Sequence, residues 1–390
     1  MPRQPVLIDV TRLAARLLEG KRPTGVDRVS LAYIAHFRSQ ARAVVRHWGR
    51  WMELGPTASA RVFAALLGDD ARPANTLRQC VATAYVARWG LSAGAPLFNT
   101  GHSGLDDPHY AQRVKRYGLK PVYFLHDLIP LTHPEYCRAG EVDKHHRRLR
   151  TMIETGRGLI VNSHATRRDL ETYAAQHALP CPATLVAHLG APDLPAAGGK
   201  PPLEMPYFVV VGTIEARKNH LLLLHVWRAL RAAHGAATPR LVLIGQRGWE
   251  CEQVVDLLER CEALRGVVVE VPGCDDAQLA NWLTHARALL FPSFVEGYGL
   301  PLVEALTLGV PVIASDLPAF REVAGDIPRY LDPIDGLGWL DMVQAYAQPA
   351  SRLRQEQIAR IQGFSAPSWQ NHFAQVETLL ETIGRSTAAP

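Results

Sequence analysis

The sequence predicts an α/β protein of two domains, with a doubly wound parallel sheet in its second half. The chain has 390 residues, which is long for one hydrophobic core and sufficient for two. Beyond residue 205, short apolar segments alternate with longer amphipathic ones, a pattern typical of parallel strands connected by helices. A tract rich in Pro, Gly and Ala at residues 190–202 separates two regions of regular pattern, so we expect the domain boundary there.

The expected domains are residues 1–200 and residues 201–365, followed by a C-terminal segment of residues 366–390. In the first domain we expect strands at residues 6–10, 121–125, 158–161 and 184–188, and one that ends near residue 99. In the second domain we expect strands at residues 207–211, 241–244, 267–271, 288–291 and 310–314. Residues 41–95 carry no pattern to which we can assign chemistry, and we expect core and loops there.

The composition indicates a chain that folds around hydrophobic cores in the cytoplasm. Apolar residues make up 47% of the chain and charged residues 20%, and no run of about twenty apolar residues predicts a membrane span. The first residues lead into a short apolar segment and not into a secretory signal. The six cysteines show no spacing typical of a metal site, which favours reduced, structural thiols.

The charge is distributed unevenly between the two halves. Residues 1–200 carry 27 Lys and Arg against 16 Asp and Glu, whereas residues 201–390 carry 15 against 21. We expect the basic half to meet an anionic partner, such as lipid headgroups or a phosphorylated acceptor, unless its charges form an ordinary solvated surface. Nucleic acid is not an expected partner, because no nucleic-acid binding motif accompanies the arginines.

A glycine-rich loop between two acidic residues is the most informative stretch of the sequence. Gly297 and Gly299 follow the strand at residues 288–291, and a helix is expected to begin near Leu300. The first N–H groups of such a helix and its dipole bind phosphate. The flanking carboxylates of Glu296 and Glu304 can accept hydrogen bonds from hydroxyl groups of the molecule that carries the phosphate. The stretch therefore predicts a site for a nucleotide sugar.

Two cations follow the first strand of the second domain. Gly212 and Thr213 form a tight turn after residues 207–211, and Arg217 and Lys218 come just before the next helix. Beside a pyrophosphate, these cations would neutralise the charge that builds on a leaving nucleoside diphosphate. The other interpretation is a surface Arg-Lys pair. We favour the functional one, because both this turn and the glycine loop follow strands of one sheet.

Two further glycines of the second domain follow strands. Gly245 begins the segment Gly-Gln-Arg-Gly-Trp, which either closes over the nucleotide or only caps a helix. Gly273 follows the strand at residues 267–271, where a base can lie against the backbone. The sequence leaves both interpretations open.

In the first domain, four residues are candidates for the acceptor side. Gly25 precedes an amphipathic helix and either lets a ligand approach the backbone or forms an ordinary turn. His126 and Asp127 end an apolar strand at the carboxyl edge of the sheet, where open α/β sheets bind ligands. His126 can orient a sugar hydroxyl or assist proton transfer, or it is structural. Ser163 follows the strand at residues 158–161 and is a plausible N-cap.

Two segments of the second half together resemble the signature of glycosyltransferase family four. They are Gly212-Thr-Ile-Glu-Ala-Arg-Lys-Asn-His220 and Glu296-Gly-Tyr-Gly-Leu-Pro-Leu-Val-Glu304, in which seven residues separate the two acids. The resemblance covers roughly residues 205–325. It departs from the family at Ala216, where relatives often have Pro. Weaker matches in the first half lie at Thr24-Gly25, His126-Asp127 and Asn162-Ser163.

The resemblance implies the GT-B fold, which has two Rossmann-like doubly wound domains facing a central cleft. It also implies that the C-terminal helix, expected at residues 365–383, crosses back to the first domain. By this resemblance the donor's diphosphate would lie against Arg217, Lys218 and the backbone of Tyr298 to Leu300. Glu296 would hold the transferred sugar, Glu304 the ribose, and His126 would lie near the reacting sugar.

The resemblance further implies a retaining, metal-independent glycosyltransferase without a cofactor. The absence of an Asp-x-Asp sequence agrees with this expectation. The loops look most like those of bacterial mannosyl- and rhamnosyltransferases that build surface polysaccharide such as lipopolysaccharide. We therefore expect a hexose to move from a nucleotide-diphosphate sugar, with GDP-mannose as first choice. The acceptor would be a saccharide or a lipid-pyrophosphate-linked molecule at the inner face of the cytoplasmic membrane.

Two other classes of enzyme compete with this interpretation. A sugar-nucleotide epimerase or hydrolase on a similar fold would need its own acid and base around the anomeric carbon. A nicotinamide-dependent dehydrogenase would need G-x-G-x-x-G after a first strand, with an acid about twenty residues further on. Neither half of the chain shows that pattern.

Overall fold

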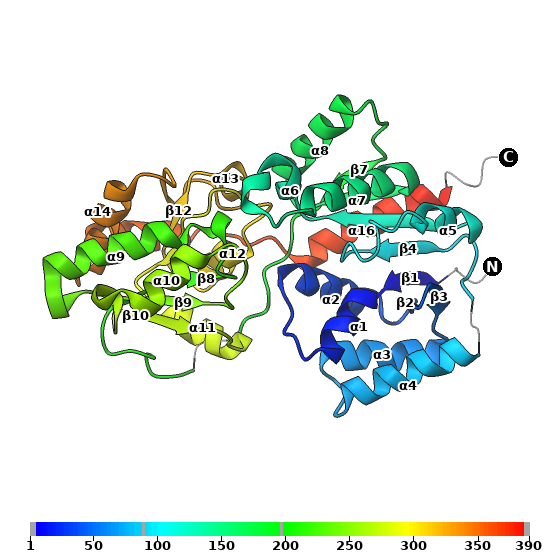
Figure 1. Ribbon diagram of the computed structural model, residues 1–390, viewed down its shortest axis with the longest axis horizontal. Coiled ribbons are helices and arrows are strands. Elements are labelled where there is room, and N and C mark those ends of the chain that lie inside the picture. Colours follow the sequence, from blue (N-terminus) through cyan, green and yellow to red (C-terminus); the bar gives the residue numbers. More distant parts are fainter. Residues whose placement is uncertain (1–4, 88–89, 196–197, 386–390) are drawn as a thin grey trace. The chain divides into compact units, whose positions relative to one another are not determined.

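The computed structural model describes residues 5–87, 90–195 and 198–385. The chain forms two compact units (Figure 1). Unit 1 comprises Met1–Leu128, Val142–Leu189 and Trp369–Pro390, and unit 2 comprises Ile129–Glu141 and Gly190–Ser368. No helix among the described residues combines the length and the apolar character needed to cross a bilayer.

The division between the units differs from the boundary that the sequence suggests at residue 200. It falls after Leu189, because hydrogen bonds tie the connecting tract to unit 2. The Ala191 amide donates to the Pro367 carbonyl at 2.9 Å, and the Asn281 side-chain amide donates to the Lys200 carbonyl at 3.3 Å. The described residues of the Pro- and Gly-rich tract therefore belong to unit 2, and the division falls at the start of this tract.

Unit 1 is built on a seven-stranded sheet with the order β3-β2-β1-β4-β5-β6-β7. All neighbouring strands are parallel except β3, which is antiparallel to β2. The strands are β1 (Val6–Asp9), β2 (Ala41–His47), β3 (Arg50–Glu53), β4 (Pro96–Asn99), β5 (Lys120–Leu125), β6 (Gly158–Val161) and β7 (Thr184–Val186). The helices are α1 (Thr11–Leu18), α2 (Gly25–Phe37), α3 (Pro56–Leu67), α4 (Pro73–Val86), α5 (Tyr110–Arg116), α7 (Glu141–Thr155), α8 (His164–Gln176) and α16 (Trp369–Arg385).

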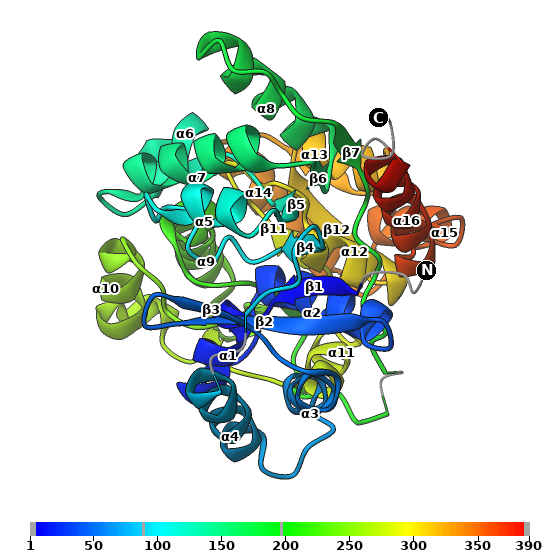
Figure 2. The ribbon, with the colours of Figure 1, turned by 90° about the vertical axis from the view of Figure 1, so that its right-hand side faces the viewer.

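Residues 41–95 contain regular elements that the sequence pattern does not reveal. They form β2, β3, α3 and α4, and the two helices lie side by side (Figure 2). Strand β2 was missed because arginines interrupt its apolar pattern. Arg46 pairs with Asp9 at 2.9 Å, and Arg42 pairs with Glu53 at 2.7 Å. These ion pairs allow a strand inside the sheet to carry charge.

The C-terminal helix α16 packs within unit 1, against β6 and β7. Phe373 is 4% exposed and lies edge-on to Tyr33, with 5.1 Å between the ring centroids. The Tyr33 hydroxyl is 3.0 Å from Nε2 of His372. Nδ1 of the same histidine lies 3.0 Å from the His188 carbonyl. Aromatic packing and these two polar contacts therefore fix the last helix to the first sheet.

Unit 2 contains a six-stranded parallel sheet with the order β10-β9-β8-β11-β12-β13. The strands are β8 (Tyr207–Val211), β9 (Arg240–Ile244), β10 (Val268–Val271), β11 (Leu289–Phe291), β12 (Val312–Ser315) and β13 (Arg329–Leu331). The helices are α6 (Ile129–Thr132), α9 (His220–His234), α10 (Glu252–Arg260), α11 (Asp276–Thr284), α12 (Leu300–Thr307), α13 (Pro318–Ala324), α14 (Gly336–Ala347) and α15 (Arg352–Ile361). This strand order is that of a doubly wound sheet. The predicted α/β fold class is confirmed.

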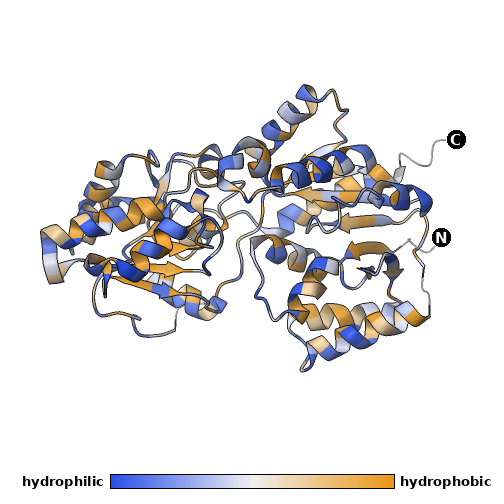
Figure 3. Ribbon diagram, viewed as in Figure 1, coloured by the Kyte–Doolittle hydropathy of each residue, from blue (hydrophilic) through white to orange (hydrophobic). Residues whose placement is uncertain are grey.

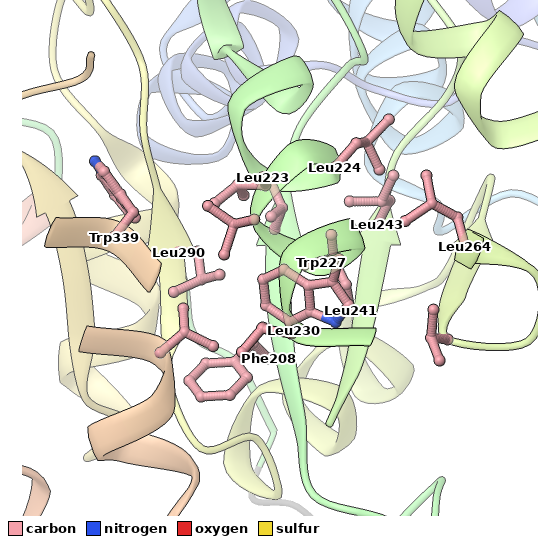
Figure 4. Close-up of a cluster of buried hydrophobic side chains, with 14 of the residues drawn as sticks. Phe208, Leu223, Leu224, Trp227, Leu230, Leu241, Leu243, Leu264, Leu290 and Trp339 are labelled. Carbon is pink, nitrogen blue, oxygen red and sulfur yellow. The ribbon is translucent and has the colours of Figure 1, made fainter. Parts of the chain in front are cut away.

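The strands of both units are mostly hydrophobic (Figure 3). In unit 2 the core forms where α9 and α14 cover the sheet (Figure 4). Trp227 of α9 is fully buried, lies edge-on to Phe208, and donates its indole N–H to the Pro239 carbonyl at 2.8 Å. Trp339 of α14 is also fully buried and donates to the Asp332 carbonyl at 3.0 Å. Both indoles therefore fill the core without an unpaired N–H group, and they fix the helices that adjoin the site.

Candidate active site

The central feature of unit 2 is the meeting of the loops that follow β8 and β11. These two strands are neighbours in the sheet, and the strand order reverses between them. In open α/β sheets, ligands bind at the carboxyl ends of strands at such a switch point. The turn with the two cations and the glycine-rich loop therefore adjoin the position where this fold binds ligands.

Backbone and side-chain hydrogen bonds join the two loops. The Phe294 amide donates to the Arg217 carbonyl at 2.9 Å. The Asn219 side-chain amide donates to the Pro292 carbonyl at 3.2 Å and to the Pro333 carbonyl at 2.7 Å. Asn219 adopts the left-handed conformation, with φ of 54°, which Asn tolerates better than most residues. Segments that are distant in the sequence thus form one hydrogen-bonded structure.

Glu296 lies at the centre of a buried ion-pair cluster. Its Oε2 is 2.7 Å from Nη1 of Arg217, and its Oε1 is 2.5 Å from Nζ of Lys218. The Ser293 hydroxyl donates to Oε1 at 2.8 Å. Nη2 of Arg217 is 2.7 Å from Oε1 of Glu215. The structure therefore brings together three residues that the sequence singles out, and it adds Glu215 and Ser293.

The charges of this cluster shift the pKa of its members. Burial raises the pKa of Glu296, but the charges of Arg217 and Lys218 outweigh burial and lower that pKa to about 2. Burial lowers the pKa of Lys218, and Glu296 opposes that shift. Burial raises the pKa of Glu215, against the attraction of Arg217. Glu296 is therefore ionised at neutral pH.

Glu296 is expected to make the stability of the protein depend on pH. Because its pKa is lower in the folded chain than its ordinary value of 4.5, the stabilisation is complete above about pH 4.5 and is lost as the pH falls towards 2. Glu296→Gln should lower the free energy of unfolding by about 3 kcal/mol at pH 7. Urea unfolding of both proteins from pH 7 to pH 3 would measure this loss. If the difference in free energy of unfolding between the unchanged protein and Glu296→Gln does not shrink below pH 4.5, the low pKa of Glu296 is wrong.

The loops after β8 and β9 are in direct contact through glycines. Gly212 has φ of +138° and Gly245 has φ of +155°. A Cβ on Gly245 would lie 2.0 Å from the Gly212 carbonyl oxygen. The Ile214 amide donates to the Gln246 carbonyl at 2.9 Å, and the Gly248 amide donates to Ile214 at 2.9 Å. The segment that begins at Gly245 thus supports the Gly212–Thr213 turn.

Gly245→Ala is expected to destabilise the protein by about 3 kcal/mol or more, because the new methyl group would overlap backbone that cannot move away. Gly235→Ala is a matched control. Gly235 also has a positive φ, of 53°, but a Cβ there meets nothing within 4 Å. The control should cost only about 1–2 kcal/mol for its backbone conformation. Equal losses in urea unfolding would show that the contact with Gly212 is unimportant.

The glycine-rich loop leads into α12 as predicted, and the helix begins at Leu300. Gly299 has φ of +104°, and a Cβ there would lie 2.7 Å from a ring carbon of Phe320. Tyr298 is 4% exposed. Glu304 lies within α12 and is also 4% exposed. The roles expected for Gly297, Tyr298, Leu300 and Glu304 in donor binding stay predictions.

Gly273 is placed differently from the other predicted donor-site glycines. It follows β10, which β9 separates from β8 in the sheet, and it is exposed. The sheet order therefore does not bring it beside the ion-pair cluster. Its contact with a base stays a prediction.

Residues Ile129–Glu141 form part of unit 2, which the sequence did not suggest. Tyr136 stacks on Phe294, with 5.1 Å between the centroids and 4° between the ring planes. The Arg138 guanidinium lies 4.6 Å from the centre of the Trp249 ring. Tyr136 therefore contacts the loop after β11, and Arg138 contacts the loop after β9. No sequence pattern could have indicated them, because each pair joins residues that are distant along the chain.

In unit 1, His126 lies at the end of β5 and is 7% exposed. Its Nε2 is 2.7 Å from the Thr100 carbonyl, which makes Nε2 the donor. Burial lowers the pKa of His126, so the ring is neutral at pH 7. The ring centroid of His102 lies 5.1 Å from that of His126. Burial also lowers the pKa of His102. The sequence missed His102, which follows the neighbouring strand β4. A neutral His126 can orient a hydroxyl group without carrying charge.

The other acceptor-side candidates lie at helix starts or beside His126. Gly25 begins α2, where Thr24 and Asp27 form a capping box. Ser163 is the N-cap of α8 and accepts a hydrogen bond from the Thr166 amide at 3.0 Å, so its N-cap role is confirmed. Asp127 directly follows His126 and is half-buried. Contact of Gly25, Asp127 and Ser163 with an acceptor stays a prediction.

The chain is similar to several known proteins. Residues 197–327 match the family described as glycosyl transferases group 1. The chain is 29% identical to O-antigen chain mannosyltransferase B of Escherichia coli, over 68% of this chain and 69% of that protein. It is 30% identical to the serotype-specific mannosyltransferase WbdA of Escherichia coli over 59% of this chain, but the match spans only 31% of WbdA.

The protein is a glycosyltransferase of the GT-B fold. Among solved structures, the glycosyltransferase is similar to HepE of Anabaena in complex with UDP and glucose. The TM-score is 0.69 at 14% identity, over 97% of this chain and 100% of HepE. It is also similar to sucrose-phosphate synthase of Thermosynechococcus elongatus, with a TM-score of 0.64 at 16% identity. This match covers 98% of this chain and 100% of the synthase. At these identities the likeness shows the fold alone. The predicted resemblance to bacterial mannosyltransferases of surface polysaccharide synthesis is confirmed.

Proposed function

We propose that this glycosyltransferase moves mannose from GDP-mannose to a growing surface polysaccharide, with retention of the anomeric configuration and without a metal ion. The observation that carries this proposal is the contact of Glu296 with both Arg217 and Lys218 at the switch point of the sheet. Two cations beside one carboxylate provide one group for a sugar and two groups for its leaving diphosphate.

The leaving diphosphate would take Arg217 and Lys218 as its partners. Negative charge develops on the diphosphate as its bond to the sugar breaks, and fixed cations in a buried site stabilise that charge. Glu296 would then be released from the two cations. Its ionised carboxylate could accept hydrogen bonds from hydroxyl groups of the sugar that is transferred. This division of roles needs no divalent metal.

The relatives support the choice of sugar. O-antigen chain mannosyltransferase B and WbdA are both named as mannosyltransferases, and mannose is the sugar we infer for this chain. An acceptor linked to a lipid pyrophosphate would suit the basic first half of the sequence. We therefore place the reaction at the cytoplasmic surface of the inner membrane. A sugar-nucleotide epimerase or hydrolase has no support among these relatives.

The donor can be identified by thermal unfolding with GDP, UDP, dTDP and ADP and with their sugars. A ligand that binds only the folded chain raises its melting temperature, and we expect GDP-mannose and GDP to raise it most. Transfer should then be measured with saccharide acceptors in excess chelator, and NMR should report the anomeric configuration of the product. Loss of transfer in chelator would refute metal independence. Donor hydrolysis or epimerisation at full rate without acceptor would refute the transferase.

A further inference from the structure

Unit 1 contains an apolar groove whose lining residues do not include His102 or His126. It has a volume of about 390 Å³ and lies between α1, the end of β2 and α4. Helices α1 and α4 are in contact, and Figure 2 shows them together. The apolar side chains that line the groove include Ala14, Leu18, Leu77, Val81, Tyr85 and Val86. The proposed transfer chemistry assigns no role to this groove.

The rim of the groove carries an unusual concentration of exposed large apolar residues. Trp48 and Val86 are both 81% exposed, and Leu18 is 40% exposed. All three line the groove. Among the described residues, the remaining exposed large apolar side chains are Ile334 and Leu337, both in unit 2. Clustering of such residues on one face indicates an interaction surface, whereas scattered ones need no explanation.

The segments that form the groove carry only positive charge. Residues 11–18, 41–50 and 73–86 contain six arginines and neither Asp nor Glu. Carboxylates of neighbouring elements neutralise four of these arginines: Asp27 pairs with Arg12 and Arg16, Asp9 with Arg46, and Glu53 with Arg42.

The two remaining arginines give the groove a net positive rim. Arg78 of α4 is exposed and has no ion pair within the described part of the chain. Arg50 lies 4.6 Å from the centre of the Tyr85 ring. The acid that follows α1, Glu19, is paired with Lys21 at 2.7 Å. The groove is therefore apolar inside and cationic at its edge.

We propose that this face of unit 1 docks on an anionic lipid bilayer, with Trp48, Val86 and Leu18 inserted at the interface. Indole rings favour the boundary between headgroups and acyl chains. Anionic headgroups attract the arginines beside these rings, and each arginine raises the affinity for the membrane roughly fivefold. Trp48 lies at the tip of the β2–β3 hairpin with a φ of 44°, so it projects from a short turn.

The charge pattern argues against a second copy of the chain as the occupant. A symmetric dimer would place the same patch on both subunits. Arg50 and Arg78 of one subunit would then face the same cations of the other, which is unfavourable. A lipid surface supplies the opposite charge and the apolar layer together. This proposal does not depend on which sugar the site transfers.

The test is flotation of the full chain with vesicles. We expect binding to vesicles that contain phosphatidylglycerol, weak binding to pure phosphatidylcholine, and a decline of the former with salt. The double variant Trp48→Ser and Val86→Ser should bind at least tenfold more weakly. The matched control, Ile334→Ser and Leu337→Ser, removes two equally exposed apolar residues from unit 2 and should bind like the unchanged protein. Arg78→Glu should weaken binding, whereas Arg228→Glu on α9 should not.

Three results would overturn the proposal. The first is absence of binding to anionic vesicles, and the second is an equal loss of vesicle binding in the two double variants. The third is a dimer in analytical ultracentrifugation that Trp48→Ser dissociates, in a protein that does not bind vesicles. Brominated lipids provide a measurement that needs no destabilising change. They should quench more fluorescence in the unchanged protein than in the folded Trp48→Phe variant, and equal quenching would also count against insertion.

Discussion

Lys218→Met is expected to lower kcat for sugar transfer by about a thousandfold and to weaken the binding of the nucleoside diphosphate. The ammonium is 2.5 Å from Glu296 and 4.8 Å from the centre of the Phe291 ring. Methionine keeps the apolar stem that contacts this ring and removes only the charge. The loss follows because fixed charges aimed at developing charge contribute about 10²–10³ each.

Calorimetric titration with GDP and single-turnover transfer would separate the two effects. Lys115→Met removes an exposed lysine of unit 1 and should leave both measurements unchanged. Circular dichroism would establish that each variant is folded. Transfer near the unchanged rate in a folded Lys218→Met protein would exclude the ammonium from the reaction.

Glu296→Gln is expected to lower kcat for sugar transfer about as much as Lys218→Met does. Unlike Lys218→Met, it should retain or strengthen the binding of GDP. The Glu296 carboxylate contacts both Arg217 and Lys218. Its neutralisation frees them for a diphosphate, because an amide competes weakly for a guanidinium and an ammonium. Transfer fails because the neutral amide cannot offer the charged acceptor that the sugar hydroxyls need.

The opposite responses of the two variants are what distinguish their roles. Calorimetry should show equal or tighter GDP binding for Glu296→Gln and weaker binding for Lys218→Met. Glu262→Gln, at a carboxylate whose side chain is 79% exposed, is the control for a change of charge in unit 2. If Glu296→Gln transferred sugar at the unchanged rate, Glu296 would have no part in the chemistry.

The sequence predicts the centre of unit 2 well because the strands β8, β9, β11 and β12 are almost entirely buried. Such strands read as apolar runs, and the strand from residues 207–211 coincides with β8. The sequence missed the edge strand β13, whose residues are only partly buried. The cations and Glu296 could be placed together, because the ends of neighbouring parallel strands meet. Ser293 had no such signal, because its hydrogen bond to Glu296 lies in a loop and not at a helix start.

Other parts of the structure depend on contacts that no local pattern records. Strand β2 carries arginines whose partners, such as Asp9, lie on other strands. Glu215 sits beside two cations in the sequence, but only the fold shows that its carboxylate lies 2.7 Å from the Arg217 guanidinium. Residues Ile129–Glu141 belong to unit 2, and contacts such as the ring stacking of Tyr136 on Phe294 join them to it. These features follow from tertiary packing alone.

The contact of Gly245 with Gly212 also constrains how this enzyme can change its donor. The two loops share backbone hydrogen bonds, as between the amide of Ile214 and Gln246, and leave no room for a side chain between them. An insertion or deletion in one loop would displace the other, and with it Arg217 and Lys218, which we propose to hold the diphosphate. Evolution of a new sugar or base preference should therefore proceed by exchange of side chains such as Trp249, at constant loop length.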